Sequence, residues 1–190
     1  MQIFAGLGNP GAAHALHRHN IGFMAVDCIA ATYRFEKWRV RFQGLVAEGT
    51  VDGHRLLLLK PATWMNDSGR AVGEALRFYK LGPDALTVFY DELDLTPGKV
   101  KVKTGGGAAG HNGIRSIDAY IGPEFRRVRL GIGHPGHKDR VTGHVLGNFT
   151  KAEIDPLADM LGAVAAELPW LAAGDDARFM NEVARRQTDD

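Results

Sequence analysis

The sequence contains only one cysteine, Cys28, among its 190 residues. A single thiol cannot form an intramolecular disulfide, which excludes a secreted fold held together by disulfides. Cys28 falls on the apolar face of a predicted helix, where a buried thiol is the expected role. This cysteine usage suits a reducing compartment and predicts a cytoplasmic protein.

Long apolar runs and linkers are also lacking. No stretch reaches the roughly 18 residues needed to cross a bilayer, and no basic N-terminal region precedes an extended apolar segment, so neither secretion nor membrane insertion is expected. No linker rich in Ser, Pro or Gly and no charge block divides the chain, of which 45% is hydrophobic. These features predict one domain over residues 1–190 with one core of ordinary size.

Net charge is small, at +1, but basic residues gather in the middle of the chain. Three lysines alternate with valines over 99–103, which places their ammonium groups on one face of a strand. Two arginines of the next strand alternate with apolar residues in the same way. This basic ridge consists of Lys99, Lys101, Lys103, Arg127 and Arg129. Like charges along one strand face repel unless an anion joins them, so we interpret the ridge as a phosphate-contacting surface rather than a plain solvent face.

Hydrophobic periodicity and turn residues divide the chain into alternating strands and helices. Strands are predicted near 2–7, 43–50, 55–60, 86–90, 98–104 and 126–132, and helices near 21–34, 68–80, 113–121, 151–169 and 175–186. A hairpin at Asp52-Gly53 makes the sheet mixed. The predicted fold class is α/β: a single-domain, three-layer α/β/α arrangement with a twisted mixed sheet, of the phosphorylase/hydrolase-like type.

Three helix starts carry capping residues. Asn20 and Ser68 are predicted N-caps, and Thr150 with Glu153 forms a capping box. Pro156 fits poorly inside the last of these helices, which predicts a kink or a delayed start.

The glycines at 6, 8 and 11 fit the GxGxxG fingerprint of dinucleotide-binding proteins. Their context does not fit, because Pro10 and a further stretch precede any helical pattern, and Asp27, at the distance of the fingerprint's acidic residue, lies inside a predicted helix. We interpret the segment as a rigid turn that holds Asn9. The alternative is an NAD- or NADP-dependent oxidoreductase, which a thermal shift with either cofactor would reveal.

Four polar residues, Asn9, Asn66, Asp91 and Asn112, lie where a predicted strand ends or a helix begins. In open α/β sheets ligands bind at the carboxyl ends of strands, so these side chains are expected to converge on one crevice. For Asn20 and Asn112 a role as helix caps is the alternative. For Asp91 the alternative is a solvated exit from its strand.

His19 is the candidate general base, because a neutral imidazole can take a proton from water near neutral pH. Asp91 is its predicted orienting partner, and the Asn66 amide is suited to hold a developing oxyanion. No serine or cysteine lies in a nucleophile-elbow setting, which favours direct attack by water. His14, His17 and His19 lack a nearby cysteine or carboxylate to complete a ligand set, so no metal is expected.

Several segments together resemble the bacterial peptidyl-tRNA hydrolase family. They occur in the family's order and spacing: GLGNPG at 6–11, HNIGF at 19–23, KPATWMNDSG at 60–69, YDELDL at 90–95, GGGAAGHNG at 105–113 and RLGIGHPG at 129–136. The resemblance implies hydrolysis of the ester between a peptide and the 3′ end of tRNA, which recycles the tRNA. It also implies a cofactor-free, metal-free monomer with no obligate protein partner.

The resemblance assigns roles to individual residues. His19 and Asp91 match the family's base and its orienting acid. Substrate contacts fall to Asn9, His14, Trp64, Met65, Asn66, His111 and Asn112, with Asn66 closest to an oxyanion role, and contacts to the tRNA 5′-phosphate fall to Lys101, Lys103 and Arg129. The alternative is a catalytically silent RNA-binding protein on the same scaffold, which an altered catalytic set would indicate; this chain retains the set.

Departures from the family pattern lie at the rim of the site. His14 and His17 stand where the family commonly has tyrosine and threonine, Trp64 replaces a phenylalanine, and Ala109 replaces a glycine of the 105–110 turn. The extra imidazoles predict a pH dependence of binding near neutrality.

Overall fold

A seven-stranded sheet forms the centre of the protein in the computed structural model, which describes residues 1–189. The strands lie in the order β2-β3-β4-β1-β5-β7-β6. They are β1 (Gln2–Gly6), β2 (Arg39–Arg41), β3 (Gly44–Val51), β4 (His54–Pro61), β5 (Leu86–Glu92), β6 (Val100–Thr104) and β7 (Arg126–Gly131). The inner strands β4, β1, β5 and β7 run parallel, while β2, β3 and β6 pair antiparallel, so the predicted mixed sheet is confirmed.

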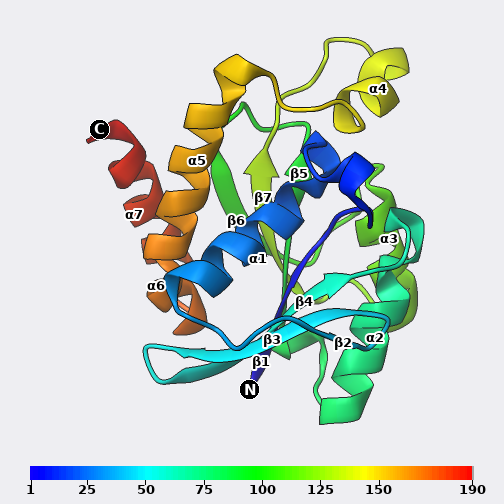
Figure 1. The fold of residues 1–190 in the computed structure, drawn as a ribbon, viewed down its shortest axis with the longest axis vertical. Helices are drawn as coiled ribbons and strands as arrows, with labels where there is room; N and C mark the ends of the chain where they lie inside the picture. The colour runs from blue at the N-terminus through cyan, green and yellow to red at the C-terminus, as the bar shows by residue number, and fades with distance from the viewer. Residues whose placement is uncertain (190) are drawn as a thin grey trace.

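Helices cover both faces of the sheet (Figure 1), which confirms the predicted three-layer α/β/α fold. One face carries α1 (Ile21–Thr32), α5 (Lys151–Ala166), α6 (Leu168–Ala172) and α7 (Asp176–Thr188). The other carries α2 (Ser68–Tyr79) and α3 (Asn112–Ile121), and the short α4 (Val141–Val145) packs its last residue against the first face. Short 3₁₀ turns are η1 (Ala12–His14), η2 (Arg18–Asn20), η3 (Met65–Asp67), η4 (Pro83–Ala85) and η5 (Lys138–Arg140). Within residues 1–189, no helix has the length and apolar character that crossing a membrane requires.

Two hydrophobic cores result, one on each face of the sheet. In β1, Ile3 and Ala5 belong to the core under α2 and α3, whereas Phe4 between them belongs to the core under α1 and α5. All three are fully buried. Burial on both faces is the expected state of a central parallel strand and explains why β1 reads as a continuous apolar run.

The predicted hairpin at Asp52-Gly53 is confirmed. The turn joins β3 to β4 with Val51 opposite His54, and both turn residues have positive φ, 48° and 82°. Two-residue turns of this kind match the twist of the flanking strands. Sequence patterning missed β2, a three-residue edge strand whose Val40 is 85% exposed, because the strand has no buried face to produce alternation.

The predicted helix caps are confirmed only in part. The Thr150–Glu153 capping box is confirmed, and α5 starts at Lys151 in spite of Pro156, so no delay occurs. Ser68 is not an N-cap, because α2 begins at Ser68 itself and its hydroxyl donates to the Met65 carbonyl oxygen. Cys28 is half-buried against α5 rather than fully buried, and burial raises the pKa of its thiol.

The motif glycines at 6 and 8 allow α1 to pack directly on the end of β1. A Cβ atom on Gly6 would lie 2.1 Å from the carbonyl oxygen of Gly22, and one on Gly8 would lie 2.7 Å from the Phe23 ring. Helix α1 thus fills the space beside these glycines, which in a dinucleotide site lies open to a pyrophosphate. The fingerprint is therefore a packing feature, and the dinucleotide alternative loses its support.

Replacing Gly6 with alanine should lower the free energy of unfolding by about 3 kcal/mol, since the new methyl meets backbone atoms that cannot rotate away. Urea denaturation measures this change. Gly162→Ala is the control, because no atom lies within 4 Å of its added Cβ on helix α5 and alanine favours a helix. Equal stability of the two variants would contradict the packing role.

Candidate active site

The predicted site residues come together at the carboxyl edge of the parallel strands. Asn9 follows β1, Asp91 lies near the end of β5, and Asn66 lies in η3, which follows β4. Because β4, β1 and β5 are adjacent and parallel, their carboxyl ends meet at one edge of the sheet. Asn112 is the first residue of α3, and His19 lies in η2, just before α1.

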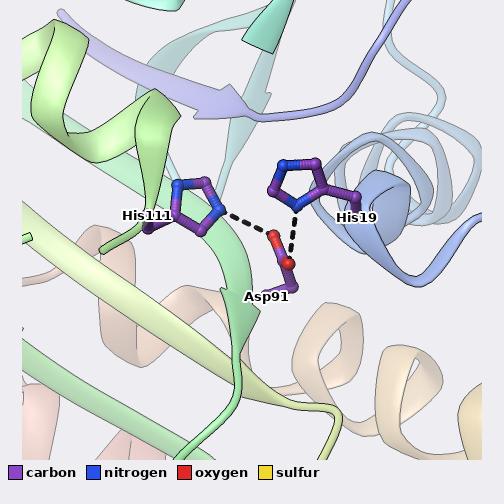
Figure 2. A group of neighbouring side chains, drawn as sticks. All are labelled: His19, Asp91 and His111. Atoms are coloured by element: carbon purple, nitrogen blue, oxygen red, sulfur yellow. Dashed lines mark hydrogen bonds and ion pairs between the residues drawn. The ribbon is translucent and has the colours of Figure 1, made fainter. Parts of the chain in front are cut away.

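Asp91 bridges two histidines (Figure 2). Its Oδ2 lies 2.7 Å from His19 Nδ1, and its Oδ1 lies 2.7 Å from His111 Nε2. The Asp91 side chain is 1% exposed, and those of His19 and His111 are 12% and 9% exposed. The predicted contact between His19 and Asp91 is therefore present. The bond from His111 was not predicted, since the resemblance assigned that residue only to substrate contacts.

The start of α3 fixes which nitrogen of His111 carries its proton. The backbone N–H groups of Gly113 and Ile114 both donate to His111 Nδ1, at 3.1 and 3.2 Å, so His111 is the N-cap of the helix. Nδ1 is then an acceptor, and neutral His111 carries its proton on Nε2, which donates to Asp91. Asn112 is therefore not the cap, and its exposed side chain is left for other contacts.

The hydrogen bond to Asp91 likewise determines which ring nitrogen of His19 carries a proton. An ionised Asp91 only accepts hydrogen bonds, so His19 Nδ1 must carry a proton and donate it to Oδ2. In neutral His19 the other nitrogen, Nε2, then has a free lone pair. This is the state that a general base needs.

Asp91 stays ionised despite its burial. Burial alone would raise the pKa of this carboxyl, but the charges and hydrogen bonds of His111 and His19 together hold its pKa well below its usual range. The carboxylate can thus stabilise an imidazolium on His19 across the whole neutral pH range.

The turn that carries Asn9 is held by side-chain amides. Asn20 Oδ1 accepts from the Asn9 backbone N–H, and Asn20 Nδ2 donates to the Asn9 carbonyl oxygen, both at 2.9 Å. Asn9 Oδ1 in turn accepts from the Met65 N–H at 2.8 Å. The expected rigid turn is therefore present. Asn20 occupies the predicted N-cap position of α1, but its side chain makes no capping bond to the helix and holds the Asn9 turn instead.

Aromatic and imidazole rings gather at the rim. His14 lies edge-on to Trp64, with ring centroids 5.7 Å apart, and edge-on to His17 at 5.0 Å. Trp64 is 61% exposed, whereas the neighbouring Met65 is buried in the core under α2 and α3. Partial burial, followed by the nearby His14 and His19, lowers the pKa of His17, so His17 is disposed to remain neutral.

A cavity of about 440 Å³ adjoins the bridged histidines. Its lining includes His19, Asp91, His111 and Asn112. It also includes Glu92 and Asp94, which follow Asp91, and residues of the segment that contains η5 and α4, namely His134, Lys138, Val141, Thr142 and Val145. The group bridged by Asp91 therefore borders a space large enough for part of a substrate.

Only part of the predicted basic ridge is exposed. Lys101 lies directly opposite Arg129 in the pairing of β6 with β7, and Lys101 is exposed. Arg127, in contrast, is fully buried under α3, so its assignment to the ridge is wrong. Its guanidinium donates to the carbonyl oxygens of Gly107 and Pro123, on either side of α3, and to Asp118 within the helix. Strand alternation reports the face on which a side chain lies but not whether a helix covers it.

The glycine turn 105–110 lies against the ridge. A Cβ atom on Gly106 would lie 3.1 Å from Lys103 Nζ, so the Lys103 ammonium packs on the backbone of the turn. Gly105, Gly106 and Gly110 all have positive φ, the conformation that only glycine adopts without strain. Ala109 has a φ of 47°, which explains why glycine suits that position better.

His19, Asp91 and His111 are also grouped closely enough to hold a metal ion, with ligand-type atoms within 4.8 Å of one another. The hydrogen bonds oppose that use. His111 Nε2 can bind a metal only without its proton, yet Nδ1 already accepts two backbone N–H bonds and cannot take that proton without breaking the helix cap. His19, Asp91 and His111 therefore fit a hydrogen-bonded group better than a metal site.

An imidazole with a free Nε2, bonded to a buried carboxylate at the carboxyl edge of an α/β sheet, has the features of a hydrolase active site. The family model described as peptidyl-tRNA hydrolase matches residues 3–190. The chain belongs to the peptidyl-tRNA hydrolase family and is a hydrolase.

Relatives and a solved structure named peptidyl-tRNA hydrolase match nearly the whole chain. The peptidyl-tRNA hydrolase of Rhizorhabdus wittichii is 67% identical over 189 residues, which cover 100% of both chains. That of Zymomonas mobilis is 65% identical, covering 98% of this chain and 99% of the relative. A crystal structure of peptidyl-tRNA hydrolase from Acinetobacter baumannii superposes with a TM-score of 0.91 at 40% identity, covering 96% of this chain and 94% of that one.

Proposed function

We propose that this protein hydrolyses the ester between a peptide and the 3′ end of tRNA, and so returns the tRNA to translation. The observation that carries the mechanism is the arrangement of His19, Asp91 and His111, which leaves His19 Nε2 free to accept a proton. The family membership of the chain supports the substrate.

In the proposed reaction, His19 Nε2 removes a proton from a water molecule as the water oxygen attacks the ester carbonyl carbon. Asp91 holds the opposite ring nitrogen and stabilises the imidazolium that forms. The bond from the carbonyl carbon to the ribose 3′ oxygen then breaks, and the imidazolium returns its proton to that oxygen. The products are free tRNA and a peptide carboxylic acid, which loses its proton to solvent, and no covalent bond to the enzyme forms.

The asparagines complete the proposed site. The exposed Asn66 amide supplies a donor for the oxyanion of the tetrahedral intermediate. Asn9, held by Asn20 and by the Met65 N–H, and Asn112 at the start of α3 hold the peptide and the reacting ester. Trp64, with His14 against it, offers an exposed aromatic face to the peptide or the terminal base.

Lys101, Lys103 and Arg129 are proposed to bind the 5′-phosphate of the tRNA. Lys103→Ala or Arg129→Ala should raise KM for full-length peptidyl-tRNA about tenfold but leave KM for a short aminoacyl-oligonucleotide nearly unchanged, because only the full tRNA reaches the ridge. Steady-state kinetics on both substrates measures this difference. Lys37→Ala, on the exposed segment before β2, is the control. Equal effects on the two substrates would rule out a 5′-phosphate role.

The alternative of a catalytically silent RNA-binding protein would account for the basic ridge alone, but it leaves the bonded His19 and Asp91 and the membership of a hydrolase family without a role. It would bind tRNA but release no peptide from peptidyl-tRNA. A cleavage assay with the wild-type protein separates the two candidates directly.

A further inference from the structure

The proposed phosphate site contains an acidic side chain that its role does not require. Glu92, the last residue of β5, lies two positions beyond Tyr90, which pairs with Arg129 across β5 and β7. Its Oε1 is 3.7 Å from the Arg129 guanidinium. The Glu92 and Arg129 side chains are only 12% and 22% exposed, so water screens this pair poorly.

The contact is an ion pair without a good hydrogen bond, because 3.7 Å exceeds hydrogen-bond length. Arg129 Nε is itself buried and has no hydrogen-bond partner among residues 1–189. The Arg129 guanidinium therefore has N–H donors that can bond to a better acceptor than Glu92. A phosphate oxygen is such an acceptor, since Arg–phosphate bonds are short and often bidentate.

Positive charge surrounds the pair on the side of the ridge. Lys101 stands directly opposite Arg129 on β6, and among the described residues 1–189 neither Lys101 nor Lys103 forms an ion pair with a carboxylate. Glu92 is therefore the carboxylate that offsets the charge of Arg129 in the free enzyme. A phosphate that binds Arg129 must replace the Glu92–Arg129 contact. It must also lie beside the negative charge of the Glu92 carboxylate.

We propose that Glu92 is a specificity-determining residue that competes with the terminal phosphate of the RNA for Arg129. It weakens the binding of the 5′-phosphate and thereby limits the retention of product tRNA, which carries the same 5′-phosphate as the substrate. This inference rests on the proposed phosphate role of Arg129.

The test measures inhibition by deacylated tRNA that carries either a 5′-phosphate or a 5′-hydroxyl. Glu92→Gln keeps the shape of the side chain but removes its charge. It should lower Ki for 5′-phosphorylated tRNA about fivefold, the scale of a weak ion pair, and change Ki for 5′-hydroxyl tRNA less than twofold. Asp84→Asn, which removes the same charge from an exposed position in η4, at the other end of β5, should change neither value by as much as twofold.

The Arg129→Ala background separates this inference from the one on which it rests. There, Glu92→Gln should have no effect on either Ki. If Arg129→Ala leaves the preference for a 5′-phosphate intact, the phosphate role fails and the competition fails with it. If Arg129→Ala abolishes that preference but Glu92→Gln alone raises Ki, or lowers it equally for both RNAs, only the competition is overturned. A rise in Ki would mean that Glu92 orients Arg129. An equal decrease in Ki for both RNAs would mean that Glu92 acts through a general effect of charge.

Discussion

Replacing His19 with alanine should lower kcat for peptidyl-tRNA cleavage by about 10²–10⁴-fold, because the variant lacks the group that takes the proton from the attacking water. KM should change little, since the proposed phosphate and peptide contacts remain. Single-turnover release of peptide from peptidyl-tRNA measures the loss at the chemical step.

His54→Ala is the matched control for this variant. His54 begins β4 next to the hairpin, opposite Val51, at the other end of the strand from the site. Its removal should leave cleavage at the wild-type rate, and circular dichroism should show that both variants keep the fold. Near-normal turnover by a folded His19→Ala variant would refute the mechanism.

Asp91→Asn should lower kcat nearly as much as His19→Ala, although both histidines remain. His111 must keep its proton on Nε2, because its Nδ1 accepts the two N–H bonds that cap α3. The asparagine oxygen must therefore face His111, which turns its NH₂ group toward His19 Nδ1. Neutral His19 can accept that bond only by moving its own proton to Nε2, where it no longer acts as a base.

The matched control is Asp84→Asn, an exposed carboxylate in η4 at the other end of β5, which should cleave at close to the wild-type rate. The pH dependence of kcat/KM provides a second readout, because the loss in Asp91→Asn comes from the tautomer and should persist at every pH from 6 to 9. Asp91→Asn activity within tenfold of wild type would show that the carboxylate does not set the state of His19.

Much of the site could be predicted from sequence because it follows from topology. Asn9, Asn66 and Asp91 each follow or end a strand, and adjacent parallel strands end at one edge of the sheet, so their convergence needed only the strand positions. The pairing of His19 with Asp91 followed from the chemistry of a base and its orienting acid. The substrate came from the resemblance, since no residue type by itself specifies an ester of tRNA.

The second histidine on Asp91 could not be predicted in the same way. Histidine is not among the usual N-cap residues, so the pattern before α3 suggested Asn112 as the cap. The direction of His111 Nε2 depends on how α3 docks on the sheet, and local sequence does not encode that docking. The one available signal was the position of His111 directly before a helical pattern.

Arg127 illustrates a different limit. Its alternation with Val128 correctly placed it on the same face as Lys103, its partner across β6 and β7. Helix α3 covers that face over Arg127, where the guanidinium ties together the chain on both sides of the helix, but leaves Lys101 exposed. A two-residue period gives the face of a strand, whereas burial depends on elements that are distant in sequence.

The most direct test of the proposed base is the proton position on each histidine of the free enzyme, read from ¹⁵N chemical shifts of its ring nitrogens. At a pH where both rings are neutral, His19 should carry its proton on Nδ1 and His111 should carry its proton on Nε2. A proton on Nε2 of neutral His19 would contradict the proposed mechanism, because that nitrogen would then have no lone pair with which to activate water.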